Sequence, residues 1–125
     1  MFISIDFESE EAIYMQLYNQ VIFQIATEQI KDGETLPSVR QLADTIGINM
    51  HTVNKAYSIL RQQGYITLDK VHGAVVTVNI DKLAAMEELS DNLKVVLARA
   101  LCRNLTPGEI HMIVDEVVNS FINDR

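Results

Sequence analysis

Residues 37–64 constrain the fold most, because they contain two helix-start signals separated by one glycine-containing turn. Ser38 precedes Gln41 by three positions, the spacing of a capping box that bonds free backbone groups in the first turn of a helix. Gly47 tolerates the positive φ of a tight turn and would end the short helix that Ser38 begins. Asn49 then caps a second, longer helix. Two helices joined by a few residues predict a helix-turn-helix motif.

The second helix, expected over residues 50–63, has an apolar stripe at helical spacing, which predicts a buried face. The stripe consists of Val53, Ala56, Tyr57 and Leu60. The opposite face carries His51, Thr52, Asn54, Lys55 and Ser58. After Gly64, β-rich runs at 65–68 and 74–78 flank a short turn, which is the pattern of a hairpin with a projecting tip. A hairpin in this place would be a wing.

The remaining residues predict one short strand and three further helices. Alternating apolar residues indicate the strand over 1–7, and apolar residues three and four positions apart indicate a helix that follows it and ends at Gly33. The same spacing predicts a helix over 80–104. A threonine cap followed by proline starts a last helix, which we expect over 107–122.

These elements predict an α+β, mostly helical fold in which a winged helix-turn-helix over residues 1–78 precedes a two-helix region over 79–125. The two tail helices carry more apolar surface than a two-helix hairpin can bury by itself. A second copy related by a two-fold axis would cover this surface. The alternative is that the tail folds back onto the first helix and completes a monomeric core. The candidate dimerisation residues are Leu83, Met86, Leu93, Leu97, Ala100, Ile110, Val114, Val117 and Phe121.

Composition and spacing exclude several classes of protein. No apolar run approaches the ~18 residues of a membrane helix, and the N-terminus carries no export signal, which predicts a cytoplasmic protein. The single cysteine, Cys102, excludes an internal disulfide and a zinc finger. Glu109 and His111 do not share a helix face, and we expect no metal or cofactor. The chain offers no nucleophile with its base and no glycine-rich phosphate loop, so we expect no enzyme.

Charge is distributed unevenly along the chain. The formal net charge of -7 opposes indiscriminate binding to nucleic acid or to anionic membranes. Residues 1–32 have a net charge of -5, whereas residues 38–73 have a net charge of +2. The basic residues of this second window are Arg40, Lys55, Arg61 and Lys70. A local basic window in an acidic chain permits a focused contact with phosphates.

Three motifs with defined spacings lie between residues 13 and 66. They are Ile13-Tyr14-x-Gln16-Leu17, Leu36-Pro37-Ser38-Val39-Arg40-Gln41-Leu42-Ala43 and Gly47-Ile48-Asn49-x-x-Thr52-Val53-x-Lys55-Ala56-Tyr57-x-x-Leu60-x-x-x-Gly64-Tyr65-Ile66. Together they resemble the GntR family of bacterial transcription regulators over about residues 11–78. The short tail resembles the YtrA branch of that family, in which two helices serve for dimerisation. The resemblance implies a winged helix-turn-helix that binds palindromic operators in double-stranded DNA as a homodimer.

The resemblance places candidate DNA contacts at the start of each short helix and at the wing tip. Ser38 and Arg40 would anchor a phosphate, although a plain helix cap beside a solvated arginine is the alternative. Residues of the second helix would contact base edges, with Lys55 on a phosphate. The full set is Ser38, Arg40, Asn49, His51, Thr52, Asn54, Lys55, Lys70, His72 and Gly73. Met50 stands where other branches have an arginine, so the chain lacks that guanine-reading side chain. Val71 occupies the first glycine place of the wing.

We therefore predict a sequence-specific regulator of transcription, more specifically a repressor that controls its own operon. The YtrA resemblance suggests transporter genes among its targets. The alternative from another class is a winged-helix protein-interaction module that does not bind DNA, which the acidic total charge would also fit. About 47 residues follow Val78, too few for a separate ligand-binding domain. The sequence leaves open both the existence and the identity of a small-molecule effector, and a dimer interface is the place left for one.

Overall fold

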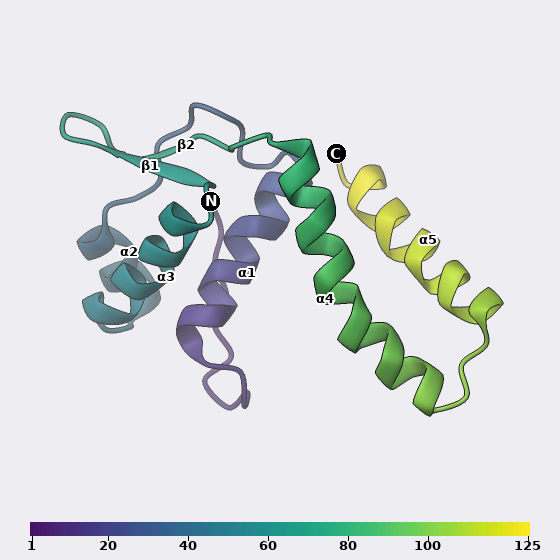
Figure 1. The fold of residues 1–125 in the computed structure, drawn as a ribbon. Coiled ribbons are helices and arrows are strands. Elements are labelled where there is room, and N and C mark those ends of the chain that lie inside the picture. The colour runs from purple at the N-terminus through teal and green to yellow at the C-terminus, as the bar shows by residue number, and fades with distance from the viewer. The chain divides into compact units, whose positions relative to one another are not determined.

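The computed structural model describes all of residues 1–125 and contains five helices and one two-stranded antiparallel sheet (Figure 1). The elements are α1 (Ile13–Ala26), α2 (Val39–Ile46), α3 (Met50–Gln62), β1 (Ile66–Asp69), β2 (Gly73–Val76), α4 (Lys82–Cys102) and α5 (Pro107–Asn123). They form two compact units, Met1–Asn79 together with Arg125, and Ile80–Asp124. The predicted mostly helical fold with a winged helix-turn-helix is confirmed.

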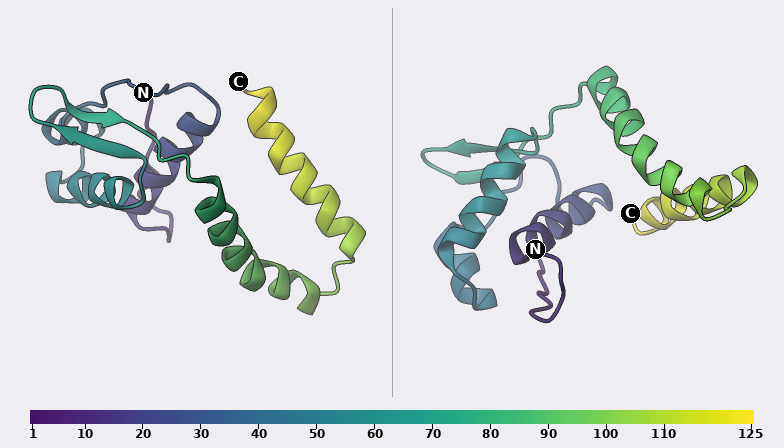
Figure 2. Two further views of the ribbon diagram at one scale, coloured as in Figure 1. Left: turned by 45° about the horizontal axis from the view of Figure 1, so that its top comes forward. Right: turned by 60° about the horizontal axis from the view of Figure 1, so that its bottom comes forward.

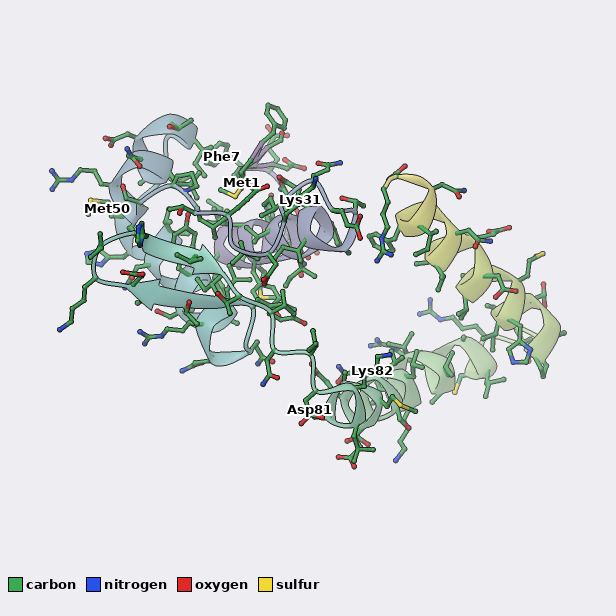
Figure 3. All side chains as sticks on the ribbon, turned by 90° about the horizontal axis from the view of Figure 1, so that it is seen from above. Met1, Phe7, Lys31, Met50, Asp81 and Lys82 are labelled. Carbon is green, nitrogen blue, oxygen red and sulfur yellow. The ribbon has the colours of Figure 1, made fainter.

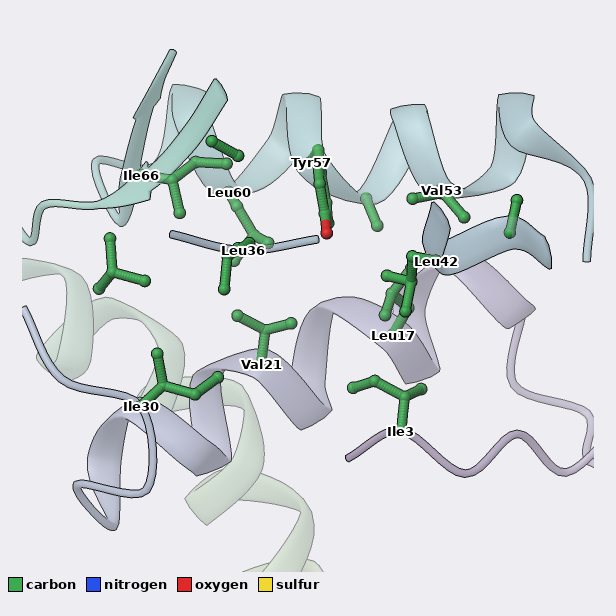
Figure 4. Close-up of a cluster of buried hydrophobic side chains, with 14 residues drawn as sticks. Ile3, Leu17, Val21, Ile30, Leu36, Leu42, Val53, Tyr57, Leu60 and Ile66 are labelled. Carbon is green, nitrogen blue, oxygen red and sulfur yellow. The ribbon is translucent and has the colours of Figure 1, made fainter. Parts of the chain in front are cut away.

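The first unit has a continuous hydrophobic core centred on α3, which packs against α1, α2 and β1 (Figure 4). Leu17 and Val21 of α1 meet Val53 and Leu60 of α3, and all four side chains are fully buried. Ile66 of β1 closes one end of this core. The residues predicted for the buried stripe of the second helix of the motif, α3, are all buried, because their three- and four-residue spacing keeps them on one face.

The helix-turn-helix forms through the signals that the sequence contains. The Ser38 hydroxyl accepts a bond from the amide of Gln41 at 3.1 Å, and the Gln41 side chain accepts one from the Ser38 amide, also at 3.1 Å. Gly47 ends α2 in the left-handed conformation with φ of 72°, which a residue with a Cβ adopts at a cost. The Asn49 side-chain oxygen then caps α3 by accepting a bond from the His51 amide at 2.7 Å.

The predicted hairpin also forms, and its tip extends beyond the helices of the first unit (Figure 1). Ile66 pairs with Val76, and Asp69 pairs with Gly73 at the tip. The other edge of β2 is occupied near its base, where Thr35 forms an isolated bridge with Val75. Near the base of the wing, β2 is therefore bonded on both of its edges, to β1 and to the segment at Thr35, while the tip is attached only through the two strands of the wing.

Two expectations about the N-terminal third are wrong. The segment over residues 1–7 is extended but pairs with no strand. Instead, three glutamines of α1 each accept a bond from a backbone amide of this segment and donate one to the carbonyl of the same residue. The pairs are Gln24 with Phe2, Gln20 with Ser4 and Gln16 with Asp6. Side-chain amides thus satisfy the backbone groups that a neighbouring strand would have bonded.

The first helix ends at Ala26 and not at Gly33. The Thr27 hydroxyl bonds the carbonyl of Phe23 at 2.9 Å, and Glu28 follows with a positive φ of 61°, so the chain leaves the helix there. This early exit returns Ile30 to the core, where 2% of its surface is exposed. Gly33 instead lies against the hairpin, with its amide donating to the Val76 carbonyl at 2.7 Å.

The second unit is a pair of antiparallel helices, α4 and α5 (Figure 2). The predicted start of α5 is confirmed: Thr106 and Glu109 form a capping box, and Pro107 occupies the first helical turn. Neither helix contains a buried residue. Leu93, Leu97, Ala100, Ile110 and Phe121 are half-buried, and the other apolar residues of the pair are mostly exposed. No helix in the structure combines the length and apolar content needed to span a bilayer.

Candidate nucleic-acid interface

The start of α2 presents Ser38 and Arg40 at the surface of the first unit. Ser38 uses its hydroxyl for the cap, while the Arg40 guanidinium has no ion-pair or hydrogen-bond partner in the structure. The buried Tyr57 of α3 donates its hydroxyl hydrogen to the Pro37 carbonyl at 2.7 Å, immediately before this helix. Burial raises the pKa of Tyr57, so the phenol stays protonated and remains a donor. The start of α2 is thus fixed to the middle of α3.

The start of α3 forms one side of an open hollow of about 570 Å³. The hollow is lined by Met50, His51 and Asn54 of α3, by Asn49, which caps that helix, and by Val39 of α2. Three of the predicted DNA contacts therefore lie together. Met50 and Val39 complete the lining and were not among the predicted contacts, because an apolar side chain at a helix start resembles an ordinary packing residue. The signal that identifies Met50 is its spacing of four from Asn54, which places both on one helix face.

Lys55 lies away from this hollow, over an aromatic ring of α1. Its ammonium nitrogen is 4.0 Å from the centroid of the Tyr14 ring, a favourable cation–π geometry. Lys55 as a whole is nevertheless exposed. The sequence did not predict this pair, since the two residues are 41 positions apart and no periodicity connects them. Thr52, also on α3, is half-buried.

The wing tip brings together Lys70 and His72, in the turn between β1 and β2, and Gly73, the first residue of β2. His72 contributes Nδ1 to a contact with the Asp69 carboxylate at 3.0 Å, and the Val71 amide donates to the other carboxylate oxygen at 2.7 Å. These bonds, with the His72 side chain the largest contributor, lower the pKa of Asp69 to about 2. Asp69 was not predicted, and its ionised carboxylate organises the tip that carries the three predicted residues.

Comparison with known proteins identifies the family. The family of bacterial regulatory proteins named gntR matches residues 13–76, which contain the helix-turn-helix and both strands. The chain belongs to the GntR family. It is a transcriptional regulator with a winged helix-turn-helix DNA-binding domain, and the expected family resemblance is confirmed.

Individual relatives agree with the YtrA-like assignment. The HTH-type transcriptional repressor YtrA of Bacillus subtilis (strain 168) is 30% identical over 118 residues, covering 92% of this chain and 91% of that protein. The solved structure of YtrA from Sulfolobus acidocaldarius, a GntR-family transcription factor, is 39% identical with a TM-score of 0.59 and covers 94% of this chain and 97% of that one. A transcriptional antiterminator from Listeria monocytogenes EGD-e is 29% identical with a TM-score of 0.86, covering 98% and 93%.

Proposed function

We propose that this GntR-family chain is a homodimeric, non-enzymatic repressor that binds a palindromic operator and acts in the cytoplasm on its own operon. Residues 1–78 would contact DNA and residues 79–125 would join the two copies. The observation that carries the proposal is the set of exposed polar and basic side chains at three places of one compact unit. These places are the start of α2, the start of α3 and the wing tip.

Each place supplies a different kind of contact to double-stranded DNA. The free amides at the start of α2 and the unpaired guanidinium of Arg40 suit a phosphate, as does the ammonium of Lys55 over the Tyr14 ring. The exposed start of α3 suits the major groove, where His51, Thr52 and Asn54 can reach base edges. Asn49 can contribute its amide hydrogens, because its oxygen is already used by the cap. Lys70, His72 and Gly73 would follow the adjacent backbone from the wing.

The second unit supports dimerisation through its uncovered apolar surface. Neither α4 nor α5 buries a residue, and Leu83 and Met86 are 69% and 67% exposed. A second copy would cover the stripe that runs along the two helices, from Leu83 to Phe121. A two-fold axis would set two α3 helices one DNA turn of ~34 Å, or a multiple, apart, which matches a palindromic operator.

Binding to a candidate operator tests the regulator proposal directly. Fluorescence anisotropy would compare a duplex from the promoter region of the chain's own operon with a shuffled duplex at one fixed salt concentration. We expect the promoter duplex to bind ~10³-fold or more tightly, as specific sites do. Equal affinities would refute sequence-specific binding, and no binding to either duplex would favour the protein-interaction module.

Salt dependence tests the phosphate contacts within the same assay. Arg40→Ala should weaken binding to both duplexes and reduce the slope of log affinity against log salt by roughly one unit for each phosphate that is no longer neutralised. Arg99→Ala is the matched control, because Arg99 lies on α4 outside the proposed DNA-binding residues. An unchanged slope in Arg40→Ala would remove Arg40 from the interface.

A further inference from the structure

The hollow at the start of α3 combines apolar and amide chemistry, and this combination matches one kind of base pair. We propose that each operator half-site presents an A·T pair to this hollow, with adenine bonded by Asn54 and the thymine 5-methyl group against Met50 and Val39. The inference rests on the proposed function and specifies which base pair the recognition helix selects.

Asn54 has the hydrogen-bonding groups that adenine requires. Its carboxamide has no partner in the structure and is exposed on α3. The major-groove edge of adenine offers one donor and one acceptor, which a carboxamide matches with its oxygen and its NH₂ group. Asn49 cannot do the same, because its oxygen accepts the His51 amide at 2.7 Å. Of the two asparagines in the hollow, only Asn54 therefore has both groups free.

Met50 supplies an apolar surface beside this amide. It occupies the first position of α3, 44% exposed, at the outer edge of the first unit (Figure 3). Its spacing of four from Asn54 places both side chains on one helix face. Val39, the first residue of α2, borders the same hollow from the neighbouring helix. The thymine methyl is the apolar group that the four bases display in the major groove, so an apolar wall favours A·T.

The cations near α3 lie outside the hollow. Guanine presents two acceptors, which arginine or lysine bonds best. Lys55 is held over Tyr14, and neither it nor Arg40 lines the hollow. A G·C pair at this place would therefore lack a bidentate cationic partner and would also present no methyl to Met50. The same residues that favour A·T thus disfavour the competing pair.

Selection from a random duplex pool, performed with the wild-type chain and with Asn54→Ala, locates the base pair. We expect wild type to enrich a palindrome with an A·T pair whose preference disappears in the Asn54→Ala pool. Enrichment of a palindrome in which the pair that depends on Asn54 is G·C would overturn this inference while leaving the regulator proposal standing. Failure of wild type to enrich any sequence would overturn the regulator proposal, and with it this inference, which rests on that proposal.

Base analogues in the enriched duplex test the two contacts separately. Replacing the thymine by deoxyuridine removes only the methyl, and wild type should bind about fourfold more weakly, the effect of one buried methyl-sized group. Replacing the adenine by 7-deazaadenine removes the N7 acceptor and should weaken binding about tenfold.

The variants must respond selectively to these analogues. Met50→Ala should lose most of the difference between the thymine and deoxyuridine duplexes, since only Val39 then remains against the methyl. Asn54→Ala should be insensitive to 7-deazaadenine. Leu68→Ala, which truncates an exposed apolar side chain of β1 outside the hollow, is the matched control and should keep both sensitivities. If Met50→Ala remains as sensitive to deoxyuridine as wild type, the methyl contact is wrong, and circular dichroism verifies that each variant is folded.

Discussion

The two units of the molecule differ in where their apolar side chains lie. In Met1–Asn79, helices and hairpin enclose a core whose central members Leu17, Val53 and Leu60 are fully buried. In Ile80–Asp124, two longer helices enclose nothing, and no residue of either is buried. The length of its helices therefore does not indicate whether a unit has its own core, since the shortest helix, α2, belongs to the unit that has one.

Local start signals are the same in both units. Ser38 and Gln41 begin α2 with a capping box, and Thr106 and Glu109 begin α5 with another. Capping satisfies backbone amides of the first turn and contributes about 1 kcal/mol wherever the helix lies. The units thus share local structure and differ in tertiary burial. This difference suits the proposed dimer, in which the first unit is stabilised by its own core and the second by contacts with the other copy.

The largest expected effect is a loss of stability in the first unit. Leu60→Ala removes a fully buried side chain at the centre of the core and should lower the free energy of unfolding by about 2–5 kcal/mol. Urea unfolding followed by circular dichroism measures this change. Leu68→Ala is the matched control, because Leu68 is 58% exposed and its truncation should leave stability nearly unchanged. Equal effects of the two substitutions would contradict the core described for this unit.

The second unit should respond to substitution through assembly. Val117→Asp places a charge on the apolar stripe of α5, where the proposed partner covers it. Because Val117 is 50% exposed in the single chain, each copy loses only about 0.75 kcal/mol of further burial, and this loss alone weakens the dimer roughly tenfold. The cost of burying an unpaired carboxylate at the interface is added to this loss. Sedimentation should therefore show monomers at micromolar concentration, with operator affinity reduced.

A second substitution on α5 distinguishes the effect of the added charge from the effect of its position on the helix. Asn119→Asp adds the same charge to the same helix but lies on a different face from Val117. We expect this control to sediment as wild type does. Wild-type protein that is itself monomeric at micromolar concentration would end the dimer proposal, and the exposed stripe would then need another explanation.

Sequence patterns predicted the parts of the fold that depend on neighbouring residues. Both capping boxes, the turn at Gly47 and the hairpin follow from residues close together in the chain. The errors depend on distant partners. Glutamines of α1 hold the extended N-terminal segment from 10 to 22 positions away. The early end of α1 returns Ile30 to a core that no local pattern reveals.

The candidate interface shows the same limit. Motif spacing placed predicted contacts on α2, α3 and the wing, and the structure brings Asn49, His51 and Asn54 into one hollow. The spacing did not predict Tyr14 as the aromatic partner of Lys55, because contact between α1 and α3 requires the folded core. Side chains that are paired across elements are thus found only once the elements are packed.

The smallest expected effect lies at the wing tip, in the titration of Asp69. The pKa of its carboxyl is about 2, below the ordinary 3.8, because the ionised form accepts bonds from the His72 side chain and from two backbone amides. A carboxyl with a lowered pKa in the folded state stabilises that state above its ordinary pKa. This contribution to the tip is lost as pH falls from about 4 through 2. A carboxyl chemical-shift titration by NMR should give a midpoint near 2.

Substituting the histidine shows which bond dominates. In His72→Ala the largest cause of the shift is removed, so the midpoint should rise towards 3.8. It should stay below 3.8, because the amides of residues 71 and 72 still donate to the carboxylate. His111→Ala, in α5, is the matched control and should leave the midpoint unchanged. A midpoint in His72→Ala that equals the wild-type value would show that the turn amides alone hold Asp69 ionised, and the wing tip would keep its shape without the histidine.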